Sequence, residues 1–180
     1  MRKVILQMVT SLDGYVAGPD GDLSWIFPNL DDEIRTWINK SLSKVDVQLL
    51  GRVAYLEQAG YWPTATEELA GVMNASEKLV FSHTLTELPN PVWPNSRLAT
   101  DPTAEITRLK SKPGGDLYIP GGASFAQSLA AANLIDEYRL IQPPVVLGTG
   151  TPLFTSPLNL SLITSHPYTT GTLIKTYHPT

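Results

Sequence analysis

Short apolar runs alternate with segments of helical pattern along most of the chain, and this alternation constrains the fold more than any other feature of the sequence. The first run, Lys3–Val9, is short, apolar and rich in β-branched residues, as buried strands are. Further strands are predicted at 45–50, 78–82, 97–99, 116–119, 137–142, 160–165 and 172–177. Helices are predicted between them at 31–42, 53–58, 66–73, 103–110 and 124–132. Because strands that alternate with helices form a largely parallel sheet covered on both faces, we expect an α/β fold with three layers, α/β/α.

The last two predicted strands are joined by a short turn at Gly171, so this pair should be an antiparallel hairpin in an otherwise mostly parallel mixed sheet. No repeat, low-complexity tract or linker is visible. The proline-rich stretch Leu88–Pro94 is too short and too apolar to separate domains. Residues 1–180 are therefore predicted to form a single domain, which is large enough to bury a substantial core.

Charge and cysteine content exclude several classes of partner and site. The net charge is -4 and no basic block is present, which argues against nucleic-acid binding because phosphate backbones require clustered Lys and Arg. The chain has no cysteine and no other recognisable metal-ligand spacing, so no metal is expected. The apolar stretch at the N-terminus stops at Gln7, and no segment approaches the ~20 apolar residues of a membrane span. We therefore expect a cytoplasmic protein without a membrane partner.

Three predicted strands end in small or polar residues that lead directly into a helix or loop: Leu50-Gly51-Arg52, Phe81-Ser82-His83-Thr84 and Ile119-Pro120-Gly121-Gly122. Ligands bind beyond the carboxyl ends of strands in open parallel sheets. Glycines let a phosphate approach the backbone, and the start of a helix offers free N–H donors. Gly121-Gly122-Ala123-Ser124 thus predicts a pyrophosphate cradle, although a simple tight turn explains the same residues. The full G-x-G-x-x-G pattern is absent, so an ordinary Rossmann site is not supported.

Single side chains near these strand ends leave two interpretations open. Arg52 could bind a phosphate through a bidentate hydrogen bond from its guanidinium, with Ser82, His83 and Thr84 as further donors. Alternatively, Arg52 could form a surface ion pair with Glu57. His83 could equally be an exposed loop histidine.

Asp13 lies in Ser11-Leu12-Asp13-Gly14, directly after the first strand, where it could orient a substrate amine or supply a proton. An Asx turn or cap before Gly14 is an equally good explanation. Aromatic residues could form a platform for a ring, or they could fill the core or a dimer interface. These residues are Trp25, Phe27, Tyr55, Tyr61 and Trp62.

Taken together, these stretches resemble the dihydrofolate reductase-like superfamily, and most closely the C-terminal reductase domain of the bacterial bifunctional riboflavin deaminase-reductase and its stand-alone relatives. The resemblance covers nearly the whole chain and depends on the order and spacing of its motifs. The matching segments are Gln7–Ala17, Leu50–Tyr55, Lys78–Ser82 and the run from Tyr118 to Phe154, which includes Pro120–Ser124, Asn133–Leu140 and Pro143–Gly150.

The resemblance implies a dihydrofolate reductase-like fold, NADPH as hydride donor and, as is common in the family, a homodimer. It implies that the nicotinamide lies near Val9 and Thr10. The substrate pocket is expected at Asp13, Trp25 and Tyr55, with Asp13 as the candidate catalytic residue. The adenosine-side phosphates are expected at Gly51, Arg52, Ser82, His83 and Thr84. The pyrophosphate and adjoining ribose are expected at Gly121, Gly122, Ala123, Ser124 and Phe125.

Two features depart from the family pattern. The riboflavin-pathway reductase typically has a substrate-binding glutamate before its Gly-Gly pair, where this chain has Pro120, and the sequence contains no deaminase domain. Acidic residues at 31–33 lie near the place of the proton-donating acid of true dihydrofolate reductases, but their spacing to Gly51 does not fit, so folate reduction is not predicted.

We therefore predict an NADPH-dependent reductase of a small heterocyclic or carbonyl substrate, resembling 5-amino-6-(5-phosphoribosylamino)uracil reductase. The alternative is a non-catalytic, homodimeric NADP(H)-binding protein on the same fold.

Overall fold

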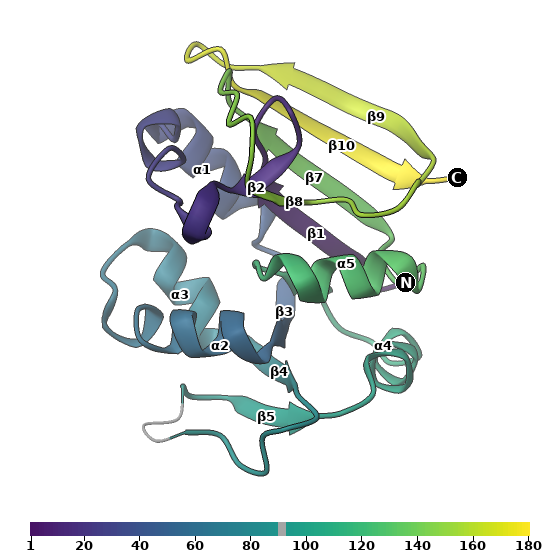
Figure 1. Cartoon of the computed structure of the whole chain (residues 1–180). Helices are drawn as coiled ribbons and strands as arrows, with labels where there is room; N and C mark the ends of the chain where they lie inside the picture. The colour runs from purple at the N-terminus through teal and green to yellow at the C-terminus, as the bar shows by residue number, and fades with distance from the viewer. Residues whose placement is uncertain (90–92) are drawn as a thin grey trace.

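A single eight-stranded sheet runs through the computed structural model, which describes residues 1–89 and 93–180 (Figure 1). Part of the predicted proline-rich stretch Leu88–Pro94 therefore lies outside the described residues. The strands follow the order β5-β4-β3-β6-β1-β7-β10-β9 across the sheet. They are β1 (Val4–Val9), β3 (Val45–Gly51), β4 (Glu77–Phe81), β5 (Ser96–Ala99), β6 (Asp116–Ile119), β7 (Glu137–Gln142), β9 (Leu160–Pro167) and β10 (Leu173–Pro179).

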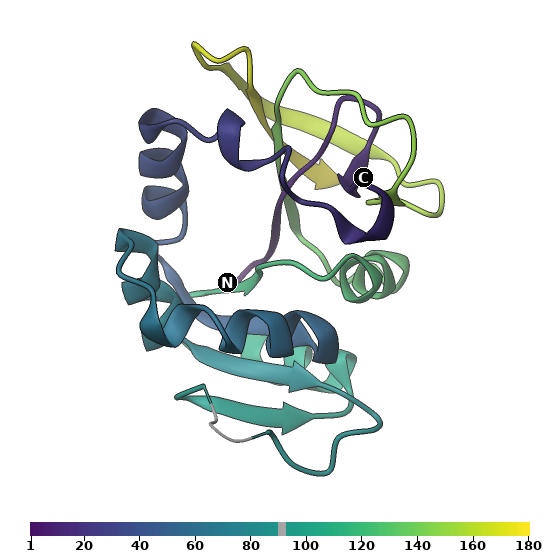
Figure 2. The ribbon, with the colours of Figure 1, turned by 60° about the vertical axis from the view of Figure 1, so that its left-hand side comes forward.

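Neighbouring strands are parallel from β5 to β7, whereas β10 pairs antiparallel with both β7 and β9. The predicted mixed sheet with an antiparallel C-terminal hairpin is thus confirmed. The hairpin and the β4–β5 pair lie at opposite ends of the sheet (Figure 2). A second sheet joins β2 (Tyr15–Ala17) to β8 (Thr151–Pro152). These strands are too short to show the residue alternation that predicts a strand, and the sequence did not indicate them.

Helices cover both faces of the large sheet, as predicted (Figure 1). The helices are α1 (Asp32–Ser41), α2 (Arg52–Ala59), α3 (Glu68–Ala75), α4 (Pro102–Lys110) and α5 (Ala123–Ala131). Short 3-10 turns lie at Pro19–Gly21, Phe27–Asn29 and Trp62–Thr64. α1 begins at Asp31, whose Oδ1 accepts a hydrogen bond from the Ile34 N–H at 2.9 Å. None of the described helices combines the length and apolar character needed to cross a membrane.

Side chains that alternate along the strands build a separate core on each face. Leu49 of β3 packs with Ile106 of α4 and Leu129 of α5 on one face. Its neighbour Leu50 packs with Met73 of α3 on the other face, together with residues of α1 and α2. This period of two in β3 directs neighbouring side chains to the two helical layers on opposite faces of the sheet.

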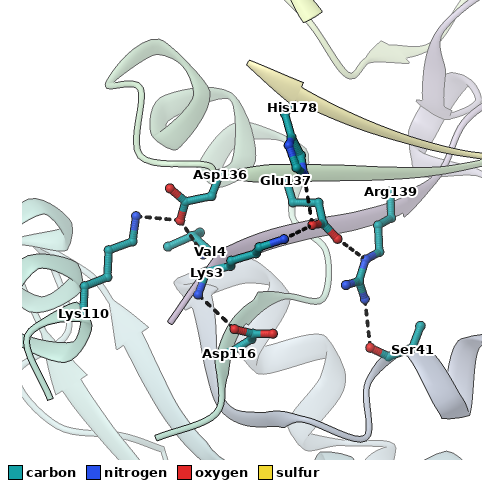
Figure 3. A network of polar contacts seen from close by, with 9 residues as sticks. All are labelled: Lys3, Val4, Ser41, Lys110, Asp116, Asp136, Glu137, Arg139 and His178. Atoms are coloured by element: carbon teal, nitrogen blue, oxygen red, sulfur yellow. Dashed lines mark hydrogen bonds and ion pairs between the residues drawn. The ribbon is translucent and has the colours of Figure 1, made fainter. Parts of the chain in front are cut away.

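A partly buried charge network joins the amino ends of β1 and β7 to the carboxyl end of β10 (Figure 3). Glu137, whose side chain is 7% exposed, accepts hydrogen bonds from Lys3 Nζ and Arg139 Nε, both at 2.7 Å. His178 Nε2 lies 3.2 Å from the same carboxylate. Arg139 also donates from Nη1 to the Ser41 carbonyl at 2.8 Å, which connects the network to the end of α1.

We expect Glu137→Gln to be less stable than the parent protein at neutral pH and to depend less on pH in the acid range. Burial alone would raise the pKa of Glu137, but hydrogen bonds from Lys3, Arg139 and His178 outweigh it and lower the pKa from 4.5 to about 2. A folded pKa below the unfolded value stabilises the fold above about pH 4.5, and this contribution is lost as the pH falls toward 2. At about pH 7, the unfolding free energy of the variant, measured by urea titration, should be about 3 kcal/mol below that of the parent. Between about pH 7 and about pH 3, the unfolding free energy should fall far less in the variant than in the parent.

Glu87→Gln removes an exposed carboxylate and should behave like the parent at both pH values. A Glu137→Gln protein with the acid dependence of the parent would contradict this account.

Candidate functional site

Helices α2 and α5 begin side by side at the carboxyl edge of the sheet. α2 follows β3 with Gly51 as its N-cap, and α5 follows β6 with Gly122 as its N-cap. A Cβ added to Gly51 would lie 2.9 Å from Cβ of Phe125, and one added to Gly122 would lie 3.0 Å from Cβ of Ala54. The two junctions therefore pack directly against each other, and only residues without a side chain fit at these points.

Among residues 1–89 and 93–180, no acceptor is found for the first N–H groups of either helix. Neither N-cap supplies a side-chain hydrogen bond, and neither first turn contains an acidic residue. Gly122 has a φ of +83° and Gly121 a φ of +150°, a region that favours glycine. Two adjacent helix N-termini with unpaired N–H groups form a good site for an anion. The structure thus brings together Gly51 and the predicted cradle 121–125.

Arg52 and His83 follow neighbouring strands at this edge, since Gly51 and Phe81 lie opposite each other in the β3–β4 register. Arg52 is exposed and makes no hydrogen bond or ion pair within residues 1–89 and 93–180, so the alternative of a pair with Glu57 is not observed. Ser82 is buried, and its Oγ accepts hydrogen bonds from the N–H groups of Thr84 at 3.1 Å and Leu85 at 3.0 Å. That turn leaves His83 and Thr84 exposed to a ligand.

A hollow of about 330 Å³ opens beside Ser82. The ends of β4 and β5 and the first turn of α4 form its walls, which include Ala99, Asp101 and Glu105. No motif in the sequence predicted this hollow. One pattern in the sequence could have indicated it: Ala99 ends a strand and Asp101 begins a helix, the same arrangement that is found at the other strand ends.

Thr10 lies at the end of β1 and carries a buried hydroxyl without a partner. Its N–H donates to the Ile141 carbonyl at 2.9 Å, but its Oγ1 has no hydrogen bond among the described residues. The residue is only 2% exposed, and a buried polar atom left unpaired costs about 1–3 kcal/mol. A bound polar group could satisfy this hydroxyl. Val9 precedes it and packs partly buried against the cluster that contains Ile34.

Asp13 connects two loops, and this geometry argues against its predicted role as a proton donor. Its Oδ1 accepts from Ser11 Oγ at 2.6 Å and from the Leu147 N–H at 3.1 Å, and its Oδ2 accepts from the Gly148 N–H at 2.7 Å. The hydrogen bond from Ser11, followed by those from Gly148 and Leu147, outweighs desolvation and lowers the pKa of Asp13 to about 2. Asp13 is therefore ionised at neutral pH and holds the loop after β7 against the turn after β1.

Tyr55 does not line a substrate pocket, so that prediction is wrong. It is 0% exposed, its ring stacks on Trp93 with 6.3 Å between centroids, and its hydroxyl accepts from the Trp93 N–H at 3.3 Å. Because α2 begins at Arg52, its Ala54–Tyr55 face is turned toward the core. Trp25 is half-buried on the connection between β1 and α1, where its Nε1 donates to the Asp22 carbonyl at 3.2 Å.

Comparison with known proteins finds one matching family model and two sequence relatives. The family model described as RibD C-terminal domain matches residues 2–174. The chain is 30% identical over 186 aligned positions to YyaP of Bacillus subtilis (strain 168), covering 98% of this chain and 95% of YyaP. It is 28% identical over 153 positions to YwjB of the same organism, covering 85% and 83%. Both relatives are described as uncharacterized proteins.

Solved structures confirm the expected fold. A protein from Shewanella sp. PV-4 whose name points to riboflavin biosynthesis superposes with a TM-score of 0.78 at 27% identity and 99% coverage of both chains. The Thermotoga maritima diaminohydroxyphosphoribosylaminopyrimidine deaminase/5-amino-6-(5-phosphoribosylamino)uracil reductase gives 0.69 at 16% identity, covering 99% of this chain but 57% of its own. Enterococcus faecalis dihydrofolate reductase, complexed with NADP(H) and RAB-propyl, gives 0.63 at 17% identity, covering 98% and 96%.

Substitution of two glycines by alanine should have opposite effects on stability. Gly51→Ala forces a methyl group against Phe125 and should lower the unfolding free energy by about 1–3 kcal/mol. Gly71→Ala, inside α3 with nothing within 4 Å of the added Cβ, should raise it by about 0.5–1 kcal/mol. Thermal and urea unfolding of both variants test this pair. Equal changes in unfolding free energy for the two variants would show that Gly51 is not closely packed against Phe125.

Proposed function

Because the chain belongs to the RibD C-terminal domain family, we propose that it is an NADPH-dependent reductase of a small heterocyclic or carbonyl substrate. The observation that carries this proposal is the pair of uncapped helix starts at Gly51 and Gly122, packed against each other beside the free guanidinium of Arg52. A dinucleotide carries several phosphate groups close together, and two adjacent anion sites on one sheet edge match that spacing of charge.

Different residues of this edge would bind different parts of the cofactor. Arg52, with His83 and Thr84, would hold the phosphates on the adenosine side, and the free N–H groups of Gly122–Ser124 would hold the pyrophosphate. The hollow beside Ser82 is large enough for part of the adenosine group. The unpaired Thr10 hydroxyl fits the polar amide of a nicotinamide at the end of β1.

NADPH, when bound, supplies a hydride, and the protein orients it and excludes water. Val9 and Thr10 would define the surface on which the ring lies. Since Asp13 is ionised, it holds the loop 145–148 in place and leaves the proton to be taken from water.

A second function, NADP(H) binding without catalysis, is favoured by Pro120, which occupies the position of the family's typical acidic residue, and by the ionised state of Asp13. Turnover distinguishes the two functions, because a binding protein retains NADPH in the presence of a panel of heterocycles and aldehydes whereas a reductase oxidises it.

We expect Arg52→Ala to weaken NADPH binding by about 10–100-fold and NADH binding by much less, because a charge-assisted contact to the 2′-phosphate is lost. Calorimetric titration and nicotinamide fluorescence measure both affinities. Arg35→Ala removes an exposed guanidinium on α1 and serves as the control. Absence of NADPH binding by the parent at millimolar concentration would overturn the proposed function, and equal losses for both cofactors would overturn the role of Arg52.

We also propose that two copies of the chain pair along β9. This edge strand carries no Asp, Glu, Lys or Arg, and Leu162 and Ile163 are 56% and 50% exposed. A long, uncharged edge strand offers unpaired backbone groups to a partner strand. The opposite edge, β5, is shorter and carries Arg97.

Light scattering on a sizing column should give about twice the monomer mass of 19.7 kDa for the parent and the monomer mass for Ile163→Lys. Leu56→Lys, on α2, is the matched exposed control and should remain dimeric. A monomeric parent at about 100 μM would contradict the pairing.

A further inference from the structure

The side chain of Gln58 lies at the end of β6, beside the glycine pair of the candidate site. A Cβ built on Gly121 would lie 3.6 Å from Gln58 Nε2, and no other atom of the described residues, chain neighbours aside, comes within 4 Å of that position. Gln58 follows Ala54 by four residues on α2, so the two share one face of the helix, and Ala54 packs against Gly122. Open space above Gly121 is therefore bordered by the amide nitrogen of Gln58.

Trp62 determines which end of the Gln58 amide faces Gly121. Trp62 Nε1 lies 3.1 Å from Gln58 Oε1, and an indole N–H can only donate, so the atom that it meets must be the carbonyl oxygen of the amide. The Nε2 end is left to face Gly121. It carries two N–H donors, and neither has an acceptor within residues 1–89 and 93–180.

Trp62 is itself held by a network that reaches into the core and joins α2 to α3, its neighbour on the same face of the sheet (Figure 1). The Trp62 carbonyl accepts from Asn74 Nδ2 at 2.9 Å, and Asn74 Oδ1 accepts from Trp93 Nε1 at 2.7 Å. Trp93 is 1% exposed, and Lys78 Nζ lies 4.5 Å from its ring centroid and donates to the Asn74 carbonyl at 2.8 Å. Gln58 Nε2 is thus the end of a fixed network that opens toward the candidate site.

The face of the sheet separates Gln58 from the donors proposed for the pyrophosphate. α5 packs on one face, whereas α1 and α2 pack on the other. β1 is the neighbour of β6, and at its end Val9 packs against Ile34 of α1. A ligand that extends from the nicotinamide position at Thr10 to Gln58 therefore lies between α1 and α2, on the face opposite to α5. That place suits the substrate.

Resting on the proposed reductase function, we infer that Gln58 is a specificity-determining residue whose Nε2 donates a hydrogen bond to an acceptor atom of the substrate, such as the carbonyl oxygen of a heterocycle. Pro120 has no N–H to offer at this strand end, so the donor comes from α2. A substrate with a donor at the same place would be rejected, because two donors would then face each other unpaired. Trp62 acts through Gln58 as a positioning residue, since an amide that is free to turn offers its oxygen as readily as its nitrogen.

Two pyrimidines of the same size test this inference by calorimetric titration, because uracil has carbonyl oxygens at the ring positions where 2,4-diaminopyrimidine has amino groups. Gln58→Met keeps the size of the side chain but has no donor. It should weaken uracil binding by about 3–10-fold and leave the affinities for 2,4-diaminopyrimidine and NADPH within about 2-fold of the parent values. Gln58→Glu presents an acceptor and should shift the preference toward 2,4-diaminopyrimidine. Glu57→Gln, an exposed neighbour on α2, should leave both pyrimidine affinities unchanged.

Absence of uracil binding by the parent, or uracil binding that Gln58→Met leaves unchanged, would overturn the inference. A loss of NADPH affinity in Gln58→Met would assign the amide to the cofactor and would overturn it as well. Uracil binding through Gln58 by a protein that never oxidises NADPH would support the donor role and overturn only the proposed reductase function.

Trp62→Phe tests the positioning role, because it frees the Gln58 amide to turn. We expect the ratio of uracil affinity to 2,4-diaminopyrimidine affinity to fall by about 3-fold. In the Gln58→Glu background the two carboxylate oxygens are equivalent, so Trp62→Phe should leave the ratio unchanged there, which a merely structural role of Trp62 would not produce. An unchanged ratio in the parent background, or an equal fall in both backgrounds, would overturn the role of Trp62.

Discussion

The close contact between the two strand-to-helix junctions is the constraint on which the candidate site depends. Gly51 lies against Phe125 and Gly122 lies against Ala54, so that any side chain at either glycine would push α2 and α5 apart. Because the contact joins β3 and β6, which are neighbours in the sheet, it aligns two helix dipoles toward one place. One helix start would attract a single anionic group weakly, whereas two starts beside the exposed Arg52 offer donors to several phosphates at once.

The two edges of the sheet have opposite electrostatic character. At the amino edge, Glu137 is satisfied by Lys3, Arg139 and His178, and this network fixes the register of β1, β7 and β10. At the carboxyl edge, Arg52 and the Thr10 hydroxyl lack partners among the described residues. Groups that are already paired stabilise the fold, and unpaired groups cost stability unless a ligand satisfies them. Two groups without partners among the described residues, Arg52 and Thr10 Oγ1, thus lie at the edge where parallel sheets bind ligands, whereas the unpaired Gln48 Oε1 and Ser96 Oγ lie within β3 and at the start of β5.

The local sequence predicted most of the helices and strands but not the contacts between segments that are distant along the chain. β6 and β7 have the predicted bounds, because each ends directly before a proline, Pro120 or Pro143. The face that Tyr55 presents depends on the start of α2, which lies one residue before the predicted one, and its ring fills the core against Trp93. Ser11 is a local partner of Asp13, but its other two partners, Leu147 and Gly148, lie more than 130 residues away, and no spacing along the chain indicates them. Residue type alone therefore predicted an acid at Asp13, where the structure has an anion that holds a loop.

Asp13 also links two segments at the carboxyl edge of the sheet. Its bonds to Leu147 and Gly148 hold the uncharged loop after β7 against the acidic segment after β1, which keeps Leu12 and Val146 next to each other. Discrimination between ligands can come from repulsion of the wrong one as well as from contacts to the right one. The exposed Arg52 and the two helix starts lie at the ends of β3 and β6, so an anionic ligand would be favoured there rather than beside the carboxylates of the segment after β1.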